Sequence, residues 1–168
     1  MIGSSLGAVH FTTAIVALAF GAIVLGVPKW TPLHRTIGAG YVAAMVILNV
    51  SALAIYRLTA HFEPFHALAL FSLATVVRGM VPALRRRPGW LMVHYWSMAW
   101  SYLALLAAAC SEIVVRLFLR AGIFTGPWQV ISGGIAIAVL FVVVGMIVLP
   151  RLQRTAMAHM SYSSSPSI

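Results

Sequence analysis

Five long apolar runs fill most of this chain and leave few positions for charged, water-facing side chains. The runs cover residues 9–27, 37–56, 65–84, 90–115 and 128–149. Hydrophobic residues make up 62% of the 168 residues and charged residues only 8%, against about 45–50% and about 25% in soluble domains. Because a helix needs about 20 apolar residues to cross a bilayer, the sequence predicts an all-α integral membrane protein with five spans.

Short connections separate the runs, so successive spans should be antiparallel neighbours. We expect the first four spans to form an antiparallel four-helix transmembrane bundle, with a fifth transmembrane helix beside it, in a single domain of residues 1–154. The first run lacks the charged start and the cleavage pattern of a signal peptide, so it should be retained. Pro150 should end the fifth span, and residues 155–168, which end in Ser-rich sequence, should form a disordered cytoplasmic tail.

The cationic residues divide unequally between the two sides of the predicted membrane. One side carries Arg57, Arg116 and Arg120, and the other carries Lys29, Arg35, Arg78, Arg85, Arg86, Arg87, Arg151 and Arg154. By the positive-inside rule the second side is cytoplasmic and the N-terminus lies outside, which suits a bacterial cytoplasmic (inner) membrane. Topology and lipid headgroups account for these cations, so we expect no nucleic-acid binding. The run Arg85, Arg86 and Arg87 should contact anionic lipid.

Each of the first four spans carries one histidine near its start: His10, His34, His66 and His94. Because successive spans reverse direction, His10 and His66 should lie toward the outer face, and the other two toward the cytoplasmic face. Two imidazoles facing each other across a bundle are the ligands of a bis-histidine haem. Each pair is therefore predicted to hold one haem b, with Arg35 and Arg78 near the propionates on the cytoplasmic side. The alternative is that each histidine is an interfacial residue that bonds headgroups or backbone groups.

Glu112 is one of only two acidic residues and lies inside the fourth apolar run. It follows His94 by eighteen residues, which is five helical turns, so both side chains should share the helix face that points into the bundle. That spacing brings Glu112 to the depth of His10 and His66, and the three side chains would form an outer cluster. The alternative partner is Arg116, four residues later on nearly the same face.

Three segments of the middle spans combine polar residues in a set order. They are LHRTIGAGY at 33–41, FEPFH at 62–66, and HYWSM at 94–98 followed by SY at 101–102 and EIVVR at 112–116. Together they resemble the bacterial membrane proteins classed as domain of unknown function 2306. The resemblance implies a multi-pass helical membrane protein with His34, His66, His94 and Glu112 as signature polar residues. It implies no particular activity. In architecture alone, the chain is also similar to cytochrome b561-type four-helix bundles.

Three functions follow from these features. The first is a small membrane electron carrier with haem at His34 and His94 and at His10 and His66. The second is a metal-dependent membrane enzyme with a divalent metal at His10, His66 and Glu112, since two histidines and a carboxylate form a common zinc or iron set. The third is a non-catalytic accessory subunit of a larger respiratory or photosynthetic complex, where histidine could ligate a pigment. A visible spectrum separates the first two, and co-purification marks the third.

Overall fold

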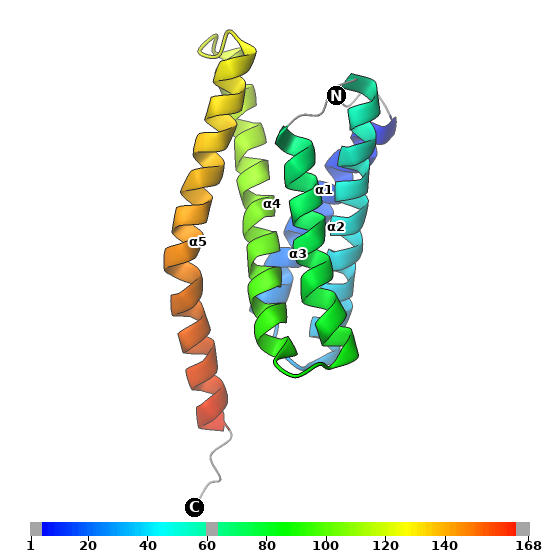
Figure 1. Ribbon diagram of the computed structural model, residues 1–168, viewed down its shortest axis with the longest axis vertical. Coiled ribbons are helices and arrows are strands. Elements are labelled where there is room, and N and C mark those ends of the chain that lie inside the picture. Colours follow the sequence, from blue (N-terminus) through cyan, green and yellow to red (C-terminus); the bar gives the residue numbers. More distant parts are fainter. Residues whose placement is uncertain (1–4, 60–63, 164–168) are drawn as a thin grey trace, which may run out of the picture. The chain divides into compact units, whose positions relative to one another are not determined.

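The computed structural model describes residues 5–59 and 64–163, and the regular structure in those ranges is entirely α-helical. In chain order the helices are α1 (Ser5–Gly26), α2 (Pro32–Thr59), α3 (Pro64–Arg85), α4 (Trp90–Arg120) and α5 (Pro127–Ser163) (Figure 1). All five contain a stretch long and apolar enough to cross a membrane. Helices satisfy their backbone hydrogen bonds internally, as lipid requires. The chain is therefore an all-α membrane protein, as the sequence predicts.

Local sequence determines where the helices begin. Prolines occupy the first positions of α2, α3 and α5, where a missing N–H costs no helical hydrogen bond. Thr31 directly precedes α2, and its hydroxyl oxygen accepts a hydrogen bond from the His34 amide at 3.1 Å. Thr31 is thus the N-cap of α2. This cap fixes His34 in the first turn of the helix.

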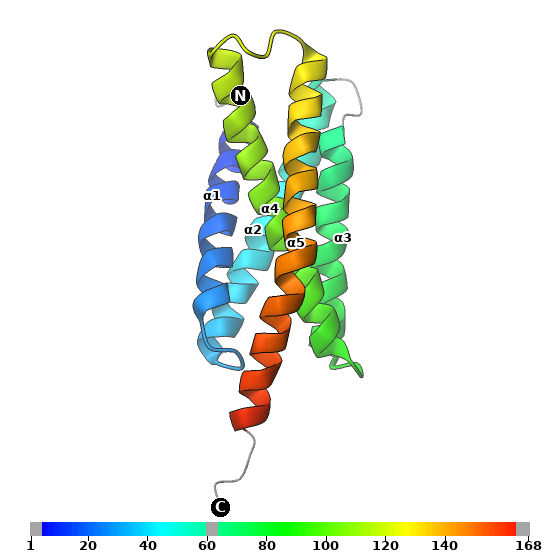
Figure 2. The ribbon, with the colours of Figure 1, turned by 90° about the vertical axis from the view of Figure 1, so that its left-hand side faces the viewer.

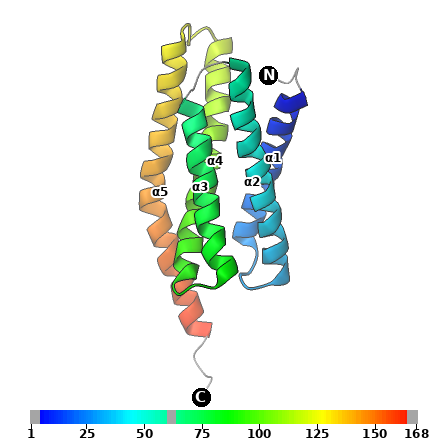
Figure 3. The same ribbon diagram turned by 45° about the vertical axis from the view of Figure 1, so that its right-hand side comes forward.

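The helices belong to two compact units that divide within α4, one of residues 1–106 and one of residues 107–168. In the first unit α1, α2, α3 and the beginning of α4 run alternately up and down, and the α1–α2 and α3–α4 connections lie at the same end (Figures 2 and 3). We call this end, formed by residues 27–31 and 86–89, the His34 end, and the opposite end of the unit the His10 end. In the second unit the Ser111 hydroxyl of α4 donates to the Gly134 carbonyl of α5 at 3.5 Å.

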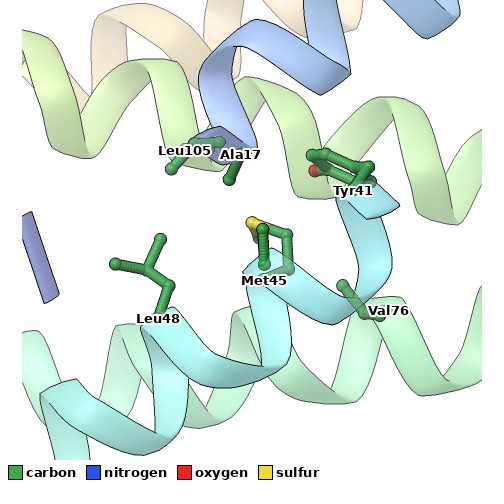
Figure 4. Close-up of a cluster of buried hydrophobic side chains, with 7 residues drawn as sticks. Ala17, Tyr41, Met45, Leu48, Val76 and Leu105 are labelled. Atoms are coloured by element: carbon green, nitrogen blue, oxygen red, sulfur yellow. The ribbon is translucent and has the colours of Figure 1, made fainter. Parts of the chain in front are cut away.

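The core of the first unit takes side chains from all four of its helices. It contains Ala17 of α1, Tyr41, Met45 and Leu48 of α2, Val76 of α3 and Leu105 of α4 (Figure 4). Met45 and Val76 are each only 1% exposed. The Tyr41 hydroxyl hydrogen-bonds the Ser101 hydroxyl at 2.9 Å, which joins α2 to α4. In lipid, close packing and such interhelical hydrogen bonds hold helices together.

The fifth helix is longer than expected. The prediction that Pro150 ends the fifth span is wrong, because α5 passes through Pro150 and continues to Ser163. Residues 155–163, expected to be disordered, are helical, and residues 164–168 lie outside the described residues. Residues 151–159 include no glycine or proline, and most of them are good helix formers. A single proline within a transmembrane helix is tolerated when the turns on both sides remain helical.

Candidate cofactor site

Two histidines from different helices lie at the His34 end of the first unit. His34 lies in the first turn of α2, and His94 lies in the second turn of α4. The structure thus places at one end of the unit the two histidines that the sequence assigned to the cytoplasmic side.

The His94 ring is held by a backbone carbonyl of α3. Its Nδ1 lies 3.1 Å from the Gly79 carbonyl oxygen. Since a carbonyl oxygen only accepts hydrogen bonds, Nδ1 carries the proton, and Nε2 of the neutral ring keeps its lone pair. A Cβ at position 79 would lie 2.5 Å from Met98 Cε and 2.9 Å from Ser97 Cβ. Glycine therefore lets α3 approach α4 closely enough to place this carbonyl against the ring.

The His34 ring has an unpartnered nitrogen. Its Nδ1 is buried and has no hydrogen-bond partner among the described residues. A buried polar atom without a partner costs about 1–3 kcal/mol. Nδ1 is therefore a nitrogen whose free energy would fall on binding a metal or a hydrogen-bond donor.

Lys29 adds a fixed positive charge beside His34. Its ammonium group donates hydrogen bonds to the carbonyl oxygens of Val24 (2.8 Å), Leu25 (3.2 Å) and Val27 (3.3 Å). A cation at the C-terminal end of a helix is stabilised by the unpaired carbonyls and the helix dipole. Burial lowers the pKa of the Lys29 ammonium. Lys29 thus caps α1 and interacts electrostatically with the His34 imidazole.

Two tryptophans connect this site to the surface of the unit. Trp90 contacts His94 edge-on with ring centroids 6.1 Å apart, and Trp30 contacts Trp90 at 5.7 Å in a T-shaped arrangement. Trp30 is 55% exposed. Its backbone φ of 71° lies in the left-handed region, which is unfavourable for a bulky residue by about 1–2 kcal/mol.

Exposed guanidinium groups border the same end of the unit. They belong to Arg35 and Arg78 and to the run Arg85, Arg86 and Arg87. None of the five makes a hydrogen bond or ion pair through its guanidinium group with a described residue. These charges are available to an anionic group such as a propionate, a phosphate or an acidic partner.

The His10 end carries the other two predicted ligands. Nδ1 of His10 lies 3.1 Å from the Ser51 hydroxyl oxygen, and that hydroxyl donates its own proton to the Leu48 carbonyl at 2.8 Å. Nδ1 of His10 is therefore the donor to Ser51. His66, near the start of α3, is buried at 6% exposure. The pairing of these two histidines around a cofactor stays a prediction. His61 and Glu63, which could join them, lie outside the described residues.

Glu112 belongs to the second unit, where it pairs with Arg116 one turn later. Nε and Nη2 of Arg116 both donate to Oε1 of Glu112, the first at 2.6 Å. About half of each side chain is exposed. The ion pair, one of the two interpretations of Glu112, is thus confirmed, because an i,i+4 partner satisfies the carboxylate locally. No group of three or more His, Cys, Asp or Glu side chains in the described part of the chain could hold a metal ion, so the set of His10, His66 and Glu112 gains no support.

Comparison with known proteins gives one result. The sequence profile of DUF2306, described as a predicted membrane protein, matches residues 7–153. The chain belongs to this family. No match was found among curated proteins, and none among solved structures. The match runs through all five helices, so the two units form parts of one DUF2306 sequence.

Three residues of this DUF2306 site have roles that the sequence does not predict. Gly79 supplies the carbonyl that orients His94, Lys29 caps α1 beside His34, and Trp90 links His94 to the surface. The sequence shows Lys29 only as a topology charge and Gly79 only as a small residue within a span. Their roles depend on contacts between helices, which no local pattern records.

Proposed function

We propose that this DUF2306 protein binds haem b between His34 and His94 and carries electrons within the membrane. The observation that carries the proposal is the state of the two imidazoles. The His94 ring bonds the Gly79 carbonyl of α3 through Nδ1, and the buried Nδ1 of His34 has no hydrogen-bond partner among the described residues. Metal-binding histidines are usually oriented by such a carbonyl, which selects the tautomer and leaves the other nitrogen to the metal.

The residues around the two histidines suit the charge of a haem. Lys29 and Arg35 can neutralise propionates at the polar end of the site. A Cβ at Gly38, one turn beyond His34, would be in ordinary van der Waals contact with Val24 Cγ2 at 3.8 Å, so α1 and α2 pack closely beside the imidazole. Trp90 offers an apolar wall next to His94.

The chain's contribution to the chemistry is ligation and orientation. When bound, haem supplies one-electron chemistry, and its potential depends on axial ligands, nearby charge and burial. The two imidazoles would hold the iron, and Trp90 packs edge-on against His94. The fixed positive charge of Lys29 favours the more negative, reduced state of a cofactor beside it.

The basic residues support an orientation in which the His34 end faces the cytoplasm of a bacterial inner membrane. Eight of the eleven cations lie on that predicted side, and cytoplasmic loops of membrane proteins carry such an excess. The N-terminus is then outside and the C-terminus cytoplasmic. The proposed cofactor would lie in the cytoplasmic leaflet.

An absorption spectrum of the purified protein tests the proposal. We expect a Soret band and, after reduction, the sharp visible bands of a low-spin b-type haem. His34→Ala and His94→Ala should each remove this spectrum, whereas the matched control His159→Ala in the C-terminal segment should retain it. Far-ultraviolet circular dichroism checks that the variants stay helical. A colourless wild type from haem-sufficient cells, or full absorbance in both variants, would contradict the proposal.

A further inference from the structure

The aromatic side chains at the His34 end form a route from the proposed cofactor to the surface. The rings of His94 and Trp90 are 6.1 Å apart, and those of Trp90 and Trp30 are 5.7 Å apart. Trp30 is half exposed, so the route begins at a surface residue and ends at an imidazole that would bind iron.

Trp30 adopts a left-handed backbone conformation that is unfavourable for a bulky residue. Its φ of 71° would suit glycine at no cost. Residues held in sparsely populated backbone regions cluster at functional sites, where the surrounding structure maintains them. Here the contact with Trp90 is the interaction that holds the Trp30 ring in place.

The charges around Trp30 are all of one sign. Lys29 is its chain neighbour, and the run Arg85, Arg86 and Arg87 ends three residues before Trp90, whose amide donates to the Arg87 carbonyl at 3.0 Å. The described residues of the first unit include no Asp or Glu. A one-sided cluster of this kind attracts partners of the opposite charge and raises their rate of encounter.

We infer that an anionic electron donor or acceptor docks over Trp30 and exchanges one electron with the cofactor iron through Trp90 and His94. The inference rests on the proposed function. It adds the position of the exchange surface and the charge of the partner. No covalent bond forms or breaks and no proton moves; one redox centre loses the electron that the other gains.

Oxidants of opposite charge test the partner's charge. The reduced protein, in nanodiscs of neutral phosphatidylcholine, is mixed with hexacyanoferrate(III) or with tris(phenanthroline)cobalt(III), and the loss of the reduced haem bands is followed. Each oxidant accepts one electron from the ferrous iron. Because salt screens attraction and repulsion alike, added salt should slow oxidation by the anion and speed oxidation by the cation.

Variants test the route and the charge cluster separately. Trp30→Leu should slow oxidation by hexacyanoferrate(III) several-fold with the spectrum and reduction potential unchanged, and Trp30→Tyr should restore most of the rate. Trp128→Leu is the control, since Trp128 is 79% exposed but lies in the second unit. The triple change Arg85→Gln, Arg86→Gln and Arg87→Gln should weaken the salt dependence, whereas Arg120→Gln should leave it unchanged.

Tryptophan fluorescence gives a readout that needs no cofactor. The difference in emission between the wild type and Trp30→Phe isolates Trp30, and iodide should quench this difference more strongly than caesium. Three results would each overturn the inference while leaving haem binding intact. They are salt dependences of the same sign for both oxidants, equal quenching by iodide and caesium, and unchanged oxidation rates in Trp30→Leu. Absence of haem would overturn both.

Anionic lipid is the alternative ligand of Arg85, Arg86 and Arg87. If they served lipid alone, phosphatidylglycerol would raise the thermal stability of the wild type but not of the triple arginine variant, and the two oxidants would show no opposite salt dependence in neutral lipid. That combination would also overturn the inference. Persistence of the opposite salt dependences in neutral lipid supports a docking partner in the aqueous phase.

Discussion

At the scale of single residues, the site depends on which atoms already have hydrogen-bond partners. The Gly79 carbonyl fixes the proton of His94 on Nδ1, and the Nδ1 of His34 is buried without a partner among the described residues. The first histidine is thus oriented and the second carries a cost that a ligand would remove. Neither property follows from the residue types alone.

Gly79→Ala should disturb both the helix contact and the ligand. The new Cβ would lie 2.9 Å from Ser97 Cβ, so α3 and α4 must separate, at a cost of about 1–3 kcal/mol. We expect a lower midpoint of thermal unfolding and a weaker Soret band. Gly126→Ala is the control, because a Cβ at this position of the second unit would meet nothing within 4 Å. A Gly79→Ala protein as stable as wild type would contradict the close approach.

The Glu112–Arg116 pair should contribute to stability and not to the cofactor. Both side chains are about half exposed, and pairs of this kind contribute about 0.2–1 kcal/mol. Glu112→Gln should lower the unfolding temperature slightly, and the double change with Arg116→Met should restore it, with haem content constant throughout. Loss of haem in Glu112→Gln alone would show that the carboxylate acts on a cofactor.

At the scale of helices, local sequence predicts where the helices lie but not where α5 ends or which side chains bond between helices. The apolar runs predict five helices because each is long enough to span a membrane. The end of α5 could not be predicted, because Pro150 is a stop signal in a soluble helix but lies within a continuous helix here. The bond from Tyr41 to Ser101 could not be predicted either, since it joins residues sixty positions apart.

Tyr41→Phe tests how strongly this bond joins α2 to α4. The Ser101 hydroxyl also donates to the Met98 carbonyl at 2.9 Å, so it keeps one partner in the variant. The expected loss is therefore at the low end of about 0.5–1.5 kcal/mol, measured by thermal unfolding in detergent. Thr36→Val should have a smaller effect, because exposed Thr36 bonds only within its own helix. An equal loss in both variants would assign no special role to the interhelical bond.

At the scale of the whole molecule, charge asymmetry predicts how the chain lies in the membrane. With the N-terminus outside, a fluorescent protein fused to the C-terminus should be bright and an alkaline phosphatase fusion inactive. Replacing Arg85, Arg86 and Arg87 with negatively charged residues should increase the fraction of molecules that insert with the C-terminus outside. An active C-terminal phosphatase with a dark fluorescent fusion would contradict the orientation.

In the candidate site, the sequence predicts which histidines share a side of the membrane but not which residue pairs with Glu112. The alternation of spans predicts that His34 and His94 share one side of the membrane, and the structure places both near the starts of α2 and α4, at the same end of the first unit. The helical spacing of Glu112 fixes the face of α4 that carries it but not the neighbour that pairs with its carboxylate. Arg116, four residues away, reaches the carboxylate first.

Electron paramagnetic resonance of the oxidised protein tests the central claim, haem iron ligated by His34 and His94, most directly. Two neutral imidazoles on ferric haem produce a low-spin signal, and loss of one ligand produces a high-spin signal. The account predicts a low-spin signal in the wild type, a high-spin signal or no haem in both His34→Ala and His94→Ala, and an unchanged low-spin signal in His159→Ala. A low-spin signal that persists in either ligand variant, or no haem signal in the wild type, would contradict it.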